Sequence, residues 1–566
     1  MKIRKRYAIW GATMLAAVAA LGVRAAYPED FKLGQNVELV VNTMRSLFMY
    51  YVDPVDPTTL GKNAAAGMLS TLDPYTELIH ADDSGEFELM ISGKYGGIGS
   101  IIRQKGEWVQ IAEPYLDSPA DRAGLEIGDT FLEVEGRDAR GMTTAEVSAI
   151  LKGDAGTTVT IRVRKFLTGE ERTLEIRREV IALPAVPYYG MLQGGVGYIL
   201  HTEFTDGSAD VVRSAFADLK AQGATSLVID LRSNGGGIMQ EAVKIVSMFV
   251  PRGTEVVSMR GRGEGTDREY RTESEPLDLE IPIAVLVDGN SASAAEIVAG
   301  ALQDLDRGVV VGQRTFGKGL VQNTLDVGFG SYLKVTTAKY YIPSGRCIQA
   351  IDYSQAAEDE GAERRSRYIP DSLINEFRTA GGRRVYDGGG VMPDVRLDPR
   401  YNSRFAIVAY SKGYIDDFAD RWETELRDGR GVTPRGFALT DGDYAAFAEF
   451  MADKDLGYES ATGRTLDALR RNAEYERYMT DEVRALLDSL GEALRDDDIR
   501  ANLEIYRTEL SELIEDAIVL RHHHSRGVTE HNLTVGKDAA LAAAVGVLGD
   551  GEEYGEILAS RDTEKK

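Results

Sequence analysis

Short apolar runs alternate with helical patterns in the middle of the chain, and this alternation constrains the fold more than any other feature. The apolar runs are residues 195–201, 226–232, 282–287 and 309–311, and the helical patterns are residues 209–221, 239–249 and 294–305. A strand that is buried on both faces reads as a continuous apolar run, and strands that alternate with helices form parallel βαβ units. Because 566 residues are about four times the usual length of one domain, the sequence predicts a multidomain α/β protein.

A hairpin is predicted directly after these units. Residues 321–327 and 332–342 read as two strands that pair across the glycine-marked turn at 328–330. We assign residues 173–400 to this core.

The first 26 residues have the pattern of an export signal. A basic start at residues 1–6 precedes an uncharged run at 7–23, and the small residues Ala25 and Ala26 follow. A run of about 17 residues is the lower limit for spanning a bilayer, so cleavage near Ala25 and retention as a membrane anchor both fit. We favour cleavage. The expected location is the bacterial cell envelope, with the protein periplasmic, secreted or anchored to the inner membrane.

The charge balance and the cysteine count exclude several classes. A net charge of −25 and a pI near 4.8 argue against binding to nucleic acid or to an anionic membrane surface, since both require a basic patch. The single cysteine, Cys347, cannot form an internal disulfide. No histidine lies near it in sequence, so we expect a half-buried structural residue at a strand end.

Three other regions differ from the core in their sequence pattern. Residues 27–83 show apolar side chains at helical spacing as far as Asp73 and Pro74, residues 84–172 show short alternating runs separated by glycine and aspartate, and residues 401–566 are helical and acidic. The sequence therefore predicts helical N- and C-terminal regions and a β-rich domain before the core.

His522, His523 and His524 lie in the C-terminal helical region. Three adjacent histidines do not face one way on a helix, so we expect a solvated helix end and no metal site.

Residues 118–136 resemble the signature of PDZ domains in its bacterial form, a short helix and turn that lead into a strand. PDZ domains bind extended peptides by adding a strand to a sheet edge, and a backbone loop captures the terminal carboxylate. The matching loop is Gly97, Ile98 and Gly99, whose amides can point at an oxyanion because glycine permits tight geometry. Taken alone, this triplet also fits an ordinary glycine turn.

A serine and a lysine offer the components of a nucleophile activated by an amine. Ser293 lies in the run 290–296 at the start of a predicted helix, and Lys318 lies between glycines in the run 315–322. No histidine occurs between positions 201 and 522, so a serine, histidine and aspartate triad would have to recruit a histidine from a distant element. Lysine is therefore the natural candidate for the base.

This chemistry needs a neutral lysine and two oxyanion donors. Burial would have to lower the pKa of Lys318 from ~10.4 by about three units, and its apolar neighbours favour that shift. Gln322, four residues further on, can hold the amine without adding charge. Backbone amides for the oxyanion are available in the turn 235–237 and at Ala294, directly after the serine.

Two other interpretations compete locally. Ser293 and Glu296 also fit a capping box, in which the serine is only a helix cap. Asn290 or Ser291 can serve as the cap instead, which would leave Ser293 in the first turn near the positive end of the helix dipole. Local sequence does not separate these alternatives.

A nucleotide-binding loop is the second rival. Residues 312–319 nearly match G-x-x-x-x-G-K-[ST], but Gly319 lacks the hydroxyl that would hold magnesium. Residues 320–327 also read as a strand where that motif requires a helix.

Four segments together closely resemble the carboxyl-terminal processing, or tail-specific, serine peptidases. They are residues 228–237, 290–302, 312–322 and 340–346, and the resemblance extends over about residues 36 to 400 with the PDZ domain included. It implies a Ser/Lys pair on a crotonase-like core of the ClpP/crotonase type that cleaves substrates near their C-termini.

The resemblance assigns roles to five residues. It places the nucleophile on Ser293, the general base on Lys318 and the glutamine that supports it on Gln322. It places the oxyanion amides on Gly236 and Ala294, although a proline often stands in the family where this chain has Gly235. It implies no cofactor and no metal, and its partners are protein or peptide substrates with free C-termini. A second copy of the chain or an activating partner is left open, as is the role of the C-terminal region.

Two functional classes remain, an active endopeptidase and a PDZ-bearing scaffold whose core is no longer catalytic. All three catalytic positions match the family, which favours the enzyme.

Overall fold

The computed structural model describes most of the chain between residues 28 and 559. The described residues are 28–81, 92–263, 265–353, 367–368, 373–458, 460–494, 498–534, 536 and 538–559, and the predicted export signal lies outside them. None of the helices in these ranges combines the length and hydropathy that a membrane crossing requires. The chain forms two compact units. The first comprises Met1–Ala81, Gln322–Thr336 and Tyr353–Ser366, and the second comprises the rest.

Two helices and a short strand form the described N-terminal part of the first unit. They are α2 (Pro28–Tyr50), α3 (Pro57–Leu69) and β1 (Glu77–Ile79). The carboxylate of Asp56 accepts two backbone N–H groups at 3.3 and 2.8 Å, and Pro57 suits the first turn, so α3 begins there. β1 pairs antiparallel with residues 332–334. The predicted helical N-terminal segment is confirmed.

A small β-rich domain opens the second unit. Its sheet has the order β3 (Ser100–Lys105), β4 (Trp108–Pro114), β5 (Thr130–Val134), β7 (Thr158–Arg164) and β8 (Glu171–Arg177), with β6 (Arg137–Asp138) beside β5. The helices are α5 (Pro119–Arg122) and α6 (Thr144–Leu151), and β2 (Lys94–Gly97) pairs with β9 (Glu179–Ala182). The predicted helix, turn and strand over residues 118–136 are confirmed.

The core of the second unit is a sheet of six strands. Their order is β10 (Tyr188–Met191), β11 (Val196–Leu200), β12 (Ser226–Asp230), β15 (Ile283–Val287), β16 (Val309–Gly312) and β23 (Val395–Arg396). All neighbours are parallel except β10 and β11. The intervening helices are α7 (Ser208–Ala221), α8 (Met239–Val246) and α9 (Ala294–Asp304). The predicted parallel βαβ units are therefore confirmed, whereas β10 and β23 were not predicted.

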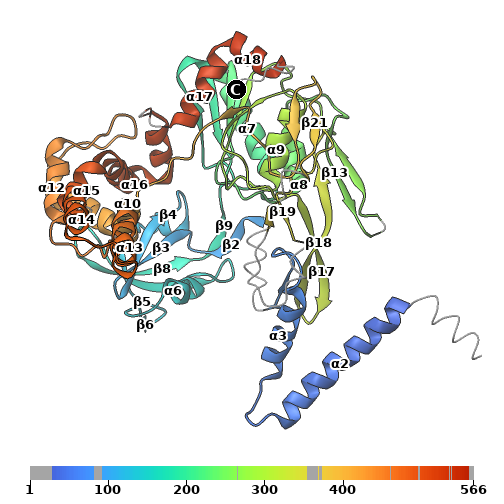
Figure 1. The fold of residues 1–566 in the computed structure, drawn as a ribbon, viewed down its shortest axis with the longest axis horizontal. Helices are drawn as coiled ribbons and strands as arrows, with labels where there is room; N and C mark the ends of the chain where they lie inside the picture. The colour runs from blue at the N-terminus through green and yellow to red at the C-terminus, as the bar shows by residue number, and fades with distance from the viewer. Residues whose placement is uncertain are drawn as a thin grey trace, which may run out of the picture. The chain divides into compact units, whose positions relative to one another are not determined.

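Successive residues of the strands face two different helical layers. Leu227 and Ile229 of β12 belong to the cluster formed with α7, α8 and α9, whereas Val228 between them packs with Leu541 of α17 (Ala539–Gly549). This alternation is the period of a strand. The C-terminal region therefore covers the second face of the central sheet, and Figure 1 shows α17 and α18 (Gly551–Ala559) beside it.

Further strands form smaller sheets. The predicted hairpin is present as β17 (Leu320–Gly328) and β18 (Ser331–Tyr341), and residues 338–341 pair with β13 (Glu255–Gly261), which pairs with β14 (Arg268–Arg271). Short pairs are formed by β19 (Ile351–Asp352) with β20 (Arg367–Tyr368) and by β21 (Glu376–Arg378) with β22 (Arg384–Tyr386). Cys347 follows β18 and is half-buried as predicted, and burial raises the pKa of its thiol.

The C-terminal region is helical, as predicted. Its helices before α17 are α10 (Arg404–Ser411), α11 (Tyr414–Arg421), a π-helical turn (Trp422–Leu426), α12 (Asp441–Met451), α13 (Ala461–Tyr475), α14 (Asp481–Leu494), α15 (Ile499–Ile505) and α16 (Arg507–Thr534). Phe405, Phe418, Trp422 and Phe447 lie in one buried cluster.

The histidine run does not form a solvated helix end, so that prediction is wrong. The three residues lie inside α16 and are half-buried. His522 Nε2 contacts Glu423 Oε2 at 2.8 Å, and His523 Nε2 contacts the Val432 carbonyl at 2.8 Å. His524 adopts a φ of 58°, which interrupts the helix. Neighbouring segments that local sequence does not reveal bury these rings.

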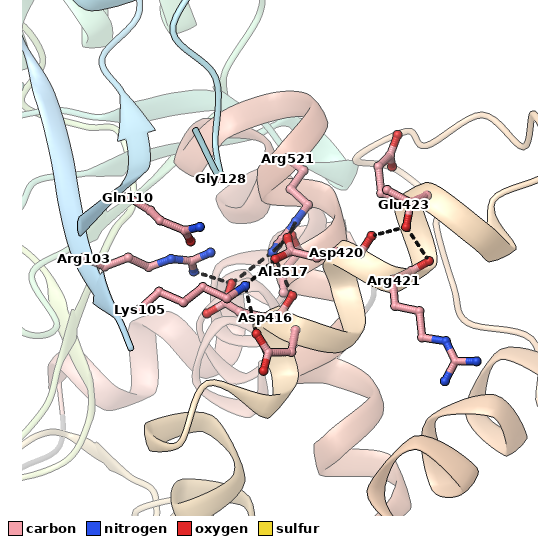
Figure 2. A network of polar contacts seen from close by, with 12 residues as sticks. Arg103, Lys105, Gln110, Gly128, Asp416, Asp420, Arg421, Glu423, Ala517 and Arg521 are labelled. Carbon is pink, nitrogen blue, oxygen red and sulfur yellow. Dashed lines mark hydrogen bonds and ion pairs between the residues drawn. The ribbon is translucent and has the colours of Figure 1, made fainter. Parts of the chain in front are cut away.

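The helical region binds the small β-rich domain through ion pairs (Figure 2). Arg103 Nη1 lies 2.5 Å from Asp416 Oδ1, and Lys105 Nζ lies 2.8 Å from Asp420 Oδ2. Arg521 of α16 also reaches Asp420, at 2.6 Å. The contact comes from β3 on one side and from α11 and α16 on the other.

Candidate active site

The predicted catalytic residues follow the carboxyl ends of neighbouring parallel strands. The turn 235–237 follows β12, Ser293 follows β15, and Lys318 follows β16. Ligands of open parallel sheets bind at this edge. The topology therefore directs three distant stretches of sequence to one edge.

Ser293 occupies the N-cap of α9 in a strained conformation. Its φ of 56° and ψ of −115° lie where a residue with a Cβ is rarely found, and such conformations cluster at functional sites. The alternative that Asn290 or Ser291 caps the helix is wrong. Ser291 is buried, and its Oγ donates to the Leu231 carbonyl at 2.8 Å and accepts the Asp288 amide at 2.9 Å.

Glu296 joins the serine loop to the lysine loop. Its fully buried carboxylate accepts the Ser293 amide and the Lys318 amide at 2.9 Å each, both on Oε2. Its Oε1 accepts the Thr315 hydroxyl at 2.5 Å and the Gly317 amide at 2.8 Å. Burial raises the pKa of Glu296 to about 7, against the effect of these four donors. The capping pattern predicted only the bond to Ser293.

Tyr340 makes a second connection between the two loops. Its buried hydroxyl contacts the Ser293 carbonyl oxygen at 3.2 Å and also contacts the Lys318 carbonyl oxygen. Sequence reasoning gave this tyrosine no role, although it lies within the segment 340–346 that carries the family resemblance.

The glycines beside Lys318 are required by close packing. A Cβ at Gly317 would lie 2.4 Å from Ala350 Cβ, and one at Gly319 would lie 2.8 Å from the Gln349 nitrogen. Lys318 is half-buried. A strand, β17, follows this loop where a phosphate-binding loop requires a helix, as predicted against the nucleotide alternative.

The glycine turn packs against the nucleophile. Gly236 has a φ of 97°, and a Cβ there would lie 2.7 Å from Ser293 Cβ and 2.9 Å from the Ala294 nitrogen. The two predicted oxyanion residues, Gly236 and Ala294, are therefore brought together. The Gly236 amide donates to Asn234 Oδ1 at 2.9 Å, so in this conformation the Asn234 side chain occupies that donor.

Asn234 and His201 support the turn, and neither was predicted. Asn234 is fully buried, and its side-chain Nδ2 donates to the backbone carbonyl of His201 at 2.7 Å. The backbone carbonyl of Asn234 accepts the Ala292 amide at 2.9 Å. Burial lowers the pKa of His201 to about 4. The sequence placed this histidine far from the serine, and only the adjacency of β11 and β12 reveals its contact with the turn.

Gln322 falls in the first unit, and Lys318 in the second. The Gln322 Nε2 group donates to Thr336 Oγ1 at 3.1 Å, and the Thr336 hydroxyl donates to Asp73 Oδ1 at 3.0 Å. The supporting role of Gln322 stays a prediction.

A narrow groove lies beside the predicted carboxylate-binding loop. It has a volume of about 40 Å³ and runs between β3 and α6, lined by Tyr95, Ile98, Gly99, Ser100, Ile102, Ser148, Leu151 and Lys152. Ile98 is buried, and Gly99 has a φ of 78°. Because β3 forms one edge of its sheet, the groove offers a strand to which an extended peptide can add.

Comparisons with known proteins match the same regions. Residues 195–355 match Peptidase family S41, residues 110–165 match the PDZ domain family, and residues 406–548 match a family described as "Probable PDZ-protease, C-terminal helical domain". The carboxy-terminal-processing protease of Bartonella bacilliformis is 35% identical over 305 residues, which are 53% of this chain and 70% of that protein.

Two further similarities were found. A Staphylococcus aureus protein described as a "Probable CtpA-like serine protease" is 33% identical over 316 residues, which are 55% of this chain and 62% of that protein. A solved photosystem II D1 C-terminal processing protease is 28% identical, with a TM-score of 0.35, over 64% of this chain and 93% of that one.

Proposed function

The chain belongs to peptidase family S41, the carboxy-terminal-processing serine peptidases, and we propose that it cleaves exported proteins near their C-termini with Ser293 as nucleophile and Lys318 as general base. The observation that carries the Ser/Lys assignment is the pair of connections between the two loops. Glu296 accepts both backbone amides, and Tyr340 contacts both backbone carbonyls. A base loop fixed to the nucleophile loop in this way supports a common catalytic role.

In the proposed reaction, Ser293 Oγ attacks the scissile carbonyl carbon while neutral Lys318 takes the proton of the serine hydroxyl. The resulting oxyanion accepts hydrogen bonds from the Gly236 and Ala294 amides, near the positive N-terminus of α9. The lysine ammonium then protonates the leaving amine. Lys318 then deprotonates a water that attacks the acyl carbon, and its ammonium returns the proton to Ser293 Oγ as the ester bond breaks and the carboxylic acid product leaves. Because Asn234 Oδ1 holds the Gly236 amide, substrate must replace it as acceptor.

We assign substrate recognition to the PDZ groove. The amides of Gly97, Ile98 and Gly99 would receive the free terminal carboxylate, while the peptide adds to β3 as a strand. Supporting observations are the edge position of β3 and the groove beside it.

The remaining assignments follow the family. They are a crotonase-like core at residues 173–400, a helical segment at 27–83, a PDZ domain at 84–172, a C-terminal helical domain at 401–566 and an export signal or membrane anchor at 1–26 that directs the protein to the cell envelope. Gln322 would support Lys318. Catalysis by these residues needs no cofactor or metal.

The test is cleavage of an unstructured protein that has a free C-terminus. We expect wild-type protein to cleave it and both Ser293→Ala and Lys318→Ala to lose activity by several orders of magnitude while remaining folded. Ser291→Ala removes a neighbouring hydroxyl and should keep most of the rate per folded molecule. A wild-type protein that binds the peptide without cleaving it would identify the scaffold alternative.

A further inference from the structure

The start of α17 lies at the edge of the sheet that carries the candidate active site. Leu541, Ala544 and Val547 of α17 pack on the sheet. Tyr554 Oη accepts the Ile283 amide at 3.0 Å, at the amino end of β15. Asp538, which caps the start of α17, lies beyond the carboxyl end of β12. The helix therefore runs antiparallel to the strands, with its N-terminus at the catalytic edge.

Asp538 forms an ion pair with Arg232, which follows β12. Arg232 Nη2 lies 2.7 Å from Asp538 Oδ2 and 2.5 Å from Asp230 Oδ2. Asp230 is buried and also accepts the Tyr198 hydroxyl at 2.7 Å. Burial opposes the charge of Asp538, but the hydrogen bond from Arg232 leaves its pKa below the usual value. This pair is about one quarter exposed, so solvent screens it less than it screens a surface pair.

Arg232 begins the loop 232–237, which follows β12 and ends in the glycine turn 235–237, and other contacts fix the rest of that loop. The Ser233 amide donates to Asp288 Oδ1 at 2.9 Å, and the Asn234 carbonyl accepts the Ala292 amide at 2.9 Å. Gly236 then packs against Ser293 without room for a Cβ. Arg232 itself is held from two sides, by Asp230 of the sheet, which also accepts its backbone amide at 3.0 Å, and by Asp538 of the C-terminal helical region.

We propose that Asp538 is a positioning residue of the peptidase, which orients the oxyanion turn through Arg232, so that the C-terminal helical region completes the active site. The inference rests on the proposed function. Removing the charge of Asp538 leaves Arg232 with one acidic partner, and the turn loses its contact with the C-terminal helical region. A displaced oxyanion donor weakens transition-state stabilisation more than substrate binding, so kcat falls and KM changes little.

The test compares two aspartates that cap neighbouring helices. Asp538→Asn keeps an oxygen for the Leu541 amide, which Asp538 accepts at 3.0 Å, but removes the charge. Asp550→Asn is the matched control, because Asp550 caps α18 by accepting the Glu552 and Glu553 amides at 3.0 and 3.1 Å. The full-length variants are assayed with an internally quenched peptide that has a free C-terminus and with a fluorophosphonate probe that labels the active serine.

We expect Asp538→Asn to lower kcat about tenfold and the labelling rate in parallel, with KM within about twofold of wild type. Asp550→Asn should match wild type, and Asp538→Glu should recover a large part of the rate because the charge is restored. Equal kcat values in Asp538→Asn and Asp550→Asn overturn the inference. A loss of kcat that is proportional to the drop in melting temperature in both variants overturns it as well. If wild-type protein neither cleaves nor reacts with the probe, the proposed function fails together with the inference.

Discussion

Glu296 is the residue whose protonation state should govern the site. An ionised carboxylate can accept the Ser293 and Lys318 amides together with the other two donors, whereas a protonated one must turn an acceptor into a donor. Since burial places its pKa at about 7, we expect kcat/KM to rise with pH through that value. Deprotonation of Lys318 acts in the same direction. Glu296→Gln should lower the rate by at least tenfold and remove the limb near pH 7, which a pH profile of both proteins measures.

Stability should follow the opposite trend at this residue. A carboxyl whose folded pKa lies above its unfolded value of 4.5 contributes stability that is present below that value and is lost as pH rises through about 7. The melting temperature of wild type relative to that of Glu296→Gln should therefore decrease as the pH rises from 4.5 to about 7. A difference that stays constant over this interval would contradict the assigned shift.

The sequence predicted individual site residues only where the signal was local. Ser293 and the hydrogen bond that its amide donates to Glu296 follow from the capping pattern, and Lys318 stands out between its glycines. Asn234, His201 and Tyr340 could not be identified, because their contacts with the site cross from one strand or loop to another.

At the scale of elements, the glycine turn provides a sharp comparison between adjacent residues. A Cβ at Gly236 would meet Ser293 and Ala294, and its φ of 97° disfavours alanine, whereas a Cβ at Gly235 would meet nothing within 4 Å. We expect Gly236→Ala to lower kcat/KM by about a hundredfold or more and Gly235→Ala to stay within a few fold of wild type. Equal activities would mean that the turn does not need to approach the nucleophile closely.

The PDZ loop allows a similar comparison with peptides that end in a free acid or an amide. We expect wild type to cleave the acid roughly tenfold faster, because the amide lacks the charge that the loop amides would bind. Gly99→Ala should reduce that ratio, since its Cβ would lie 2.5 Å from Ser118 Cβ. Gly106→Ala carries similar backbone strain in the β3–β4 turn with no neighbour within 4 Å, and it should keep the ratio. A ratio near one in wild type would remove C-terminal recognition from the proposal.

Helices and strands were predictable where a single hydrophobic pattern extends over the whole element. β12 and β15 are buried at every position, so their residues read as unbroken apolar runs. β23 has only two residues and β14 is mostly exposed, so neither has a periodic signal.

At the scale of the whole molecule, the ion pairs of Figure 2 should hold the PDZ domain to the helical region. Although burial opposes its charge, Arg103 and Arg521 keep the pKa of Asp416 below its usual 3.8, so its contribution is present above that value and is lost as pH falls further. We expect Asp416→Asn to increase hydrogen exchange in β3 and α11 at neutral pH. Asp453→Asn is the control, because Asp453 is 81% exposed and its ion pair with Lys454 is long, at 3.7 Å. Unchanged exchange in Asp416→Asn would show that apolar packing alone holds the contact.

No sequence pattern identified the element that covers the second face of the sheet. Residues 539–549 are apolar all round, which indicates burial, but a helical pattern does not identify the surface that it packs against.

The packing of α17 has a consequence for the order of biosynthesis. Ser293 and Lys318 leave the ribosome more than two hundred residues before Leu541, Ala544 and Val547. Until those residues emerge, the sheet beneath the nucleophile has one bare apolar face, and nascent domains generally fold as complete units. The newborn chain therefore cannot cover both faces of its peptidase sheet until residues 539–549 emerge, and a truncated product that ends before α17 carries both catalytic residues on a sheet with one uncovered face.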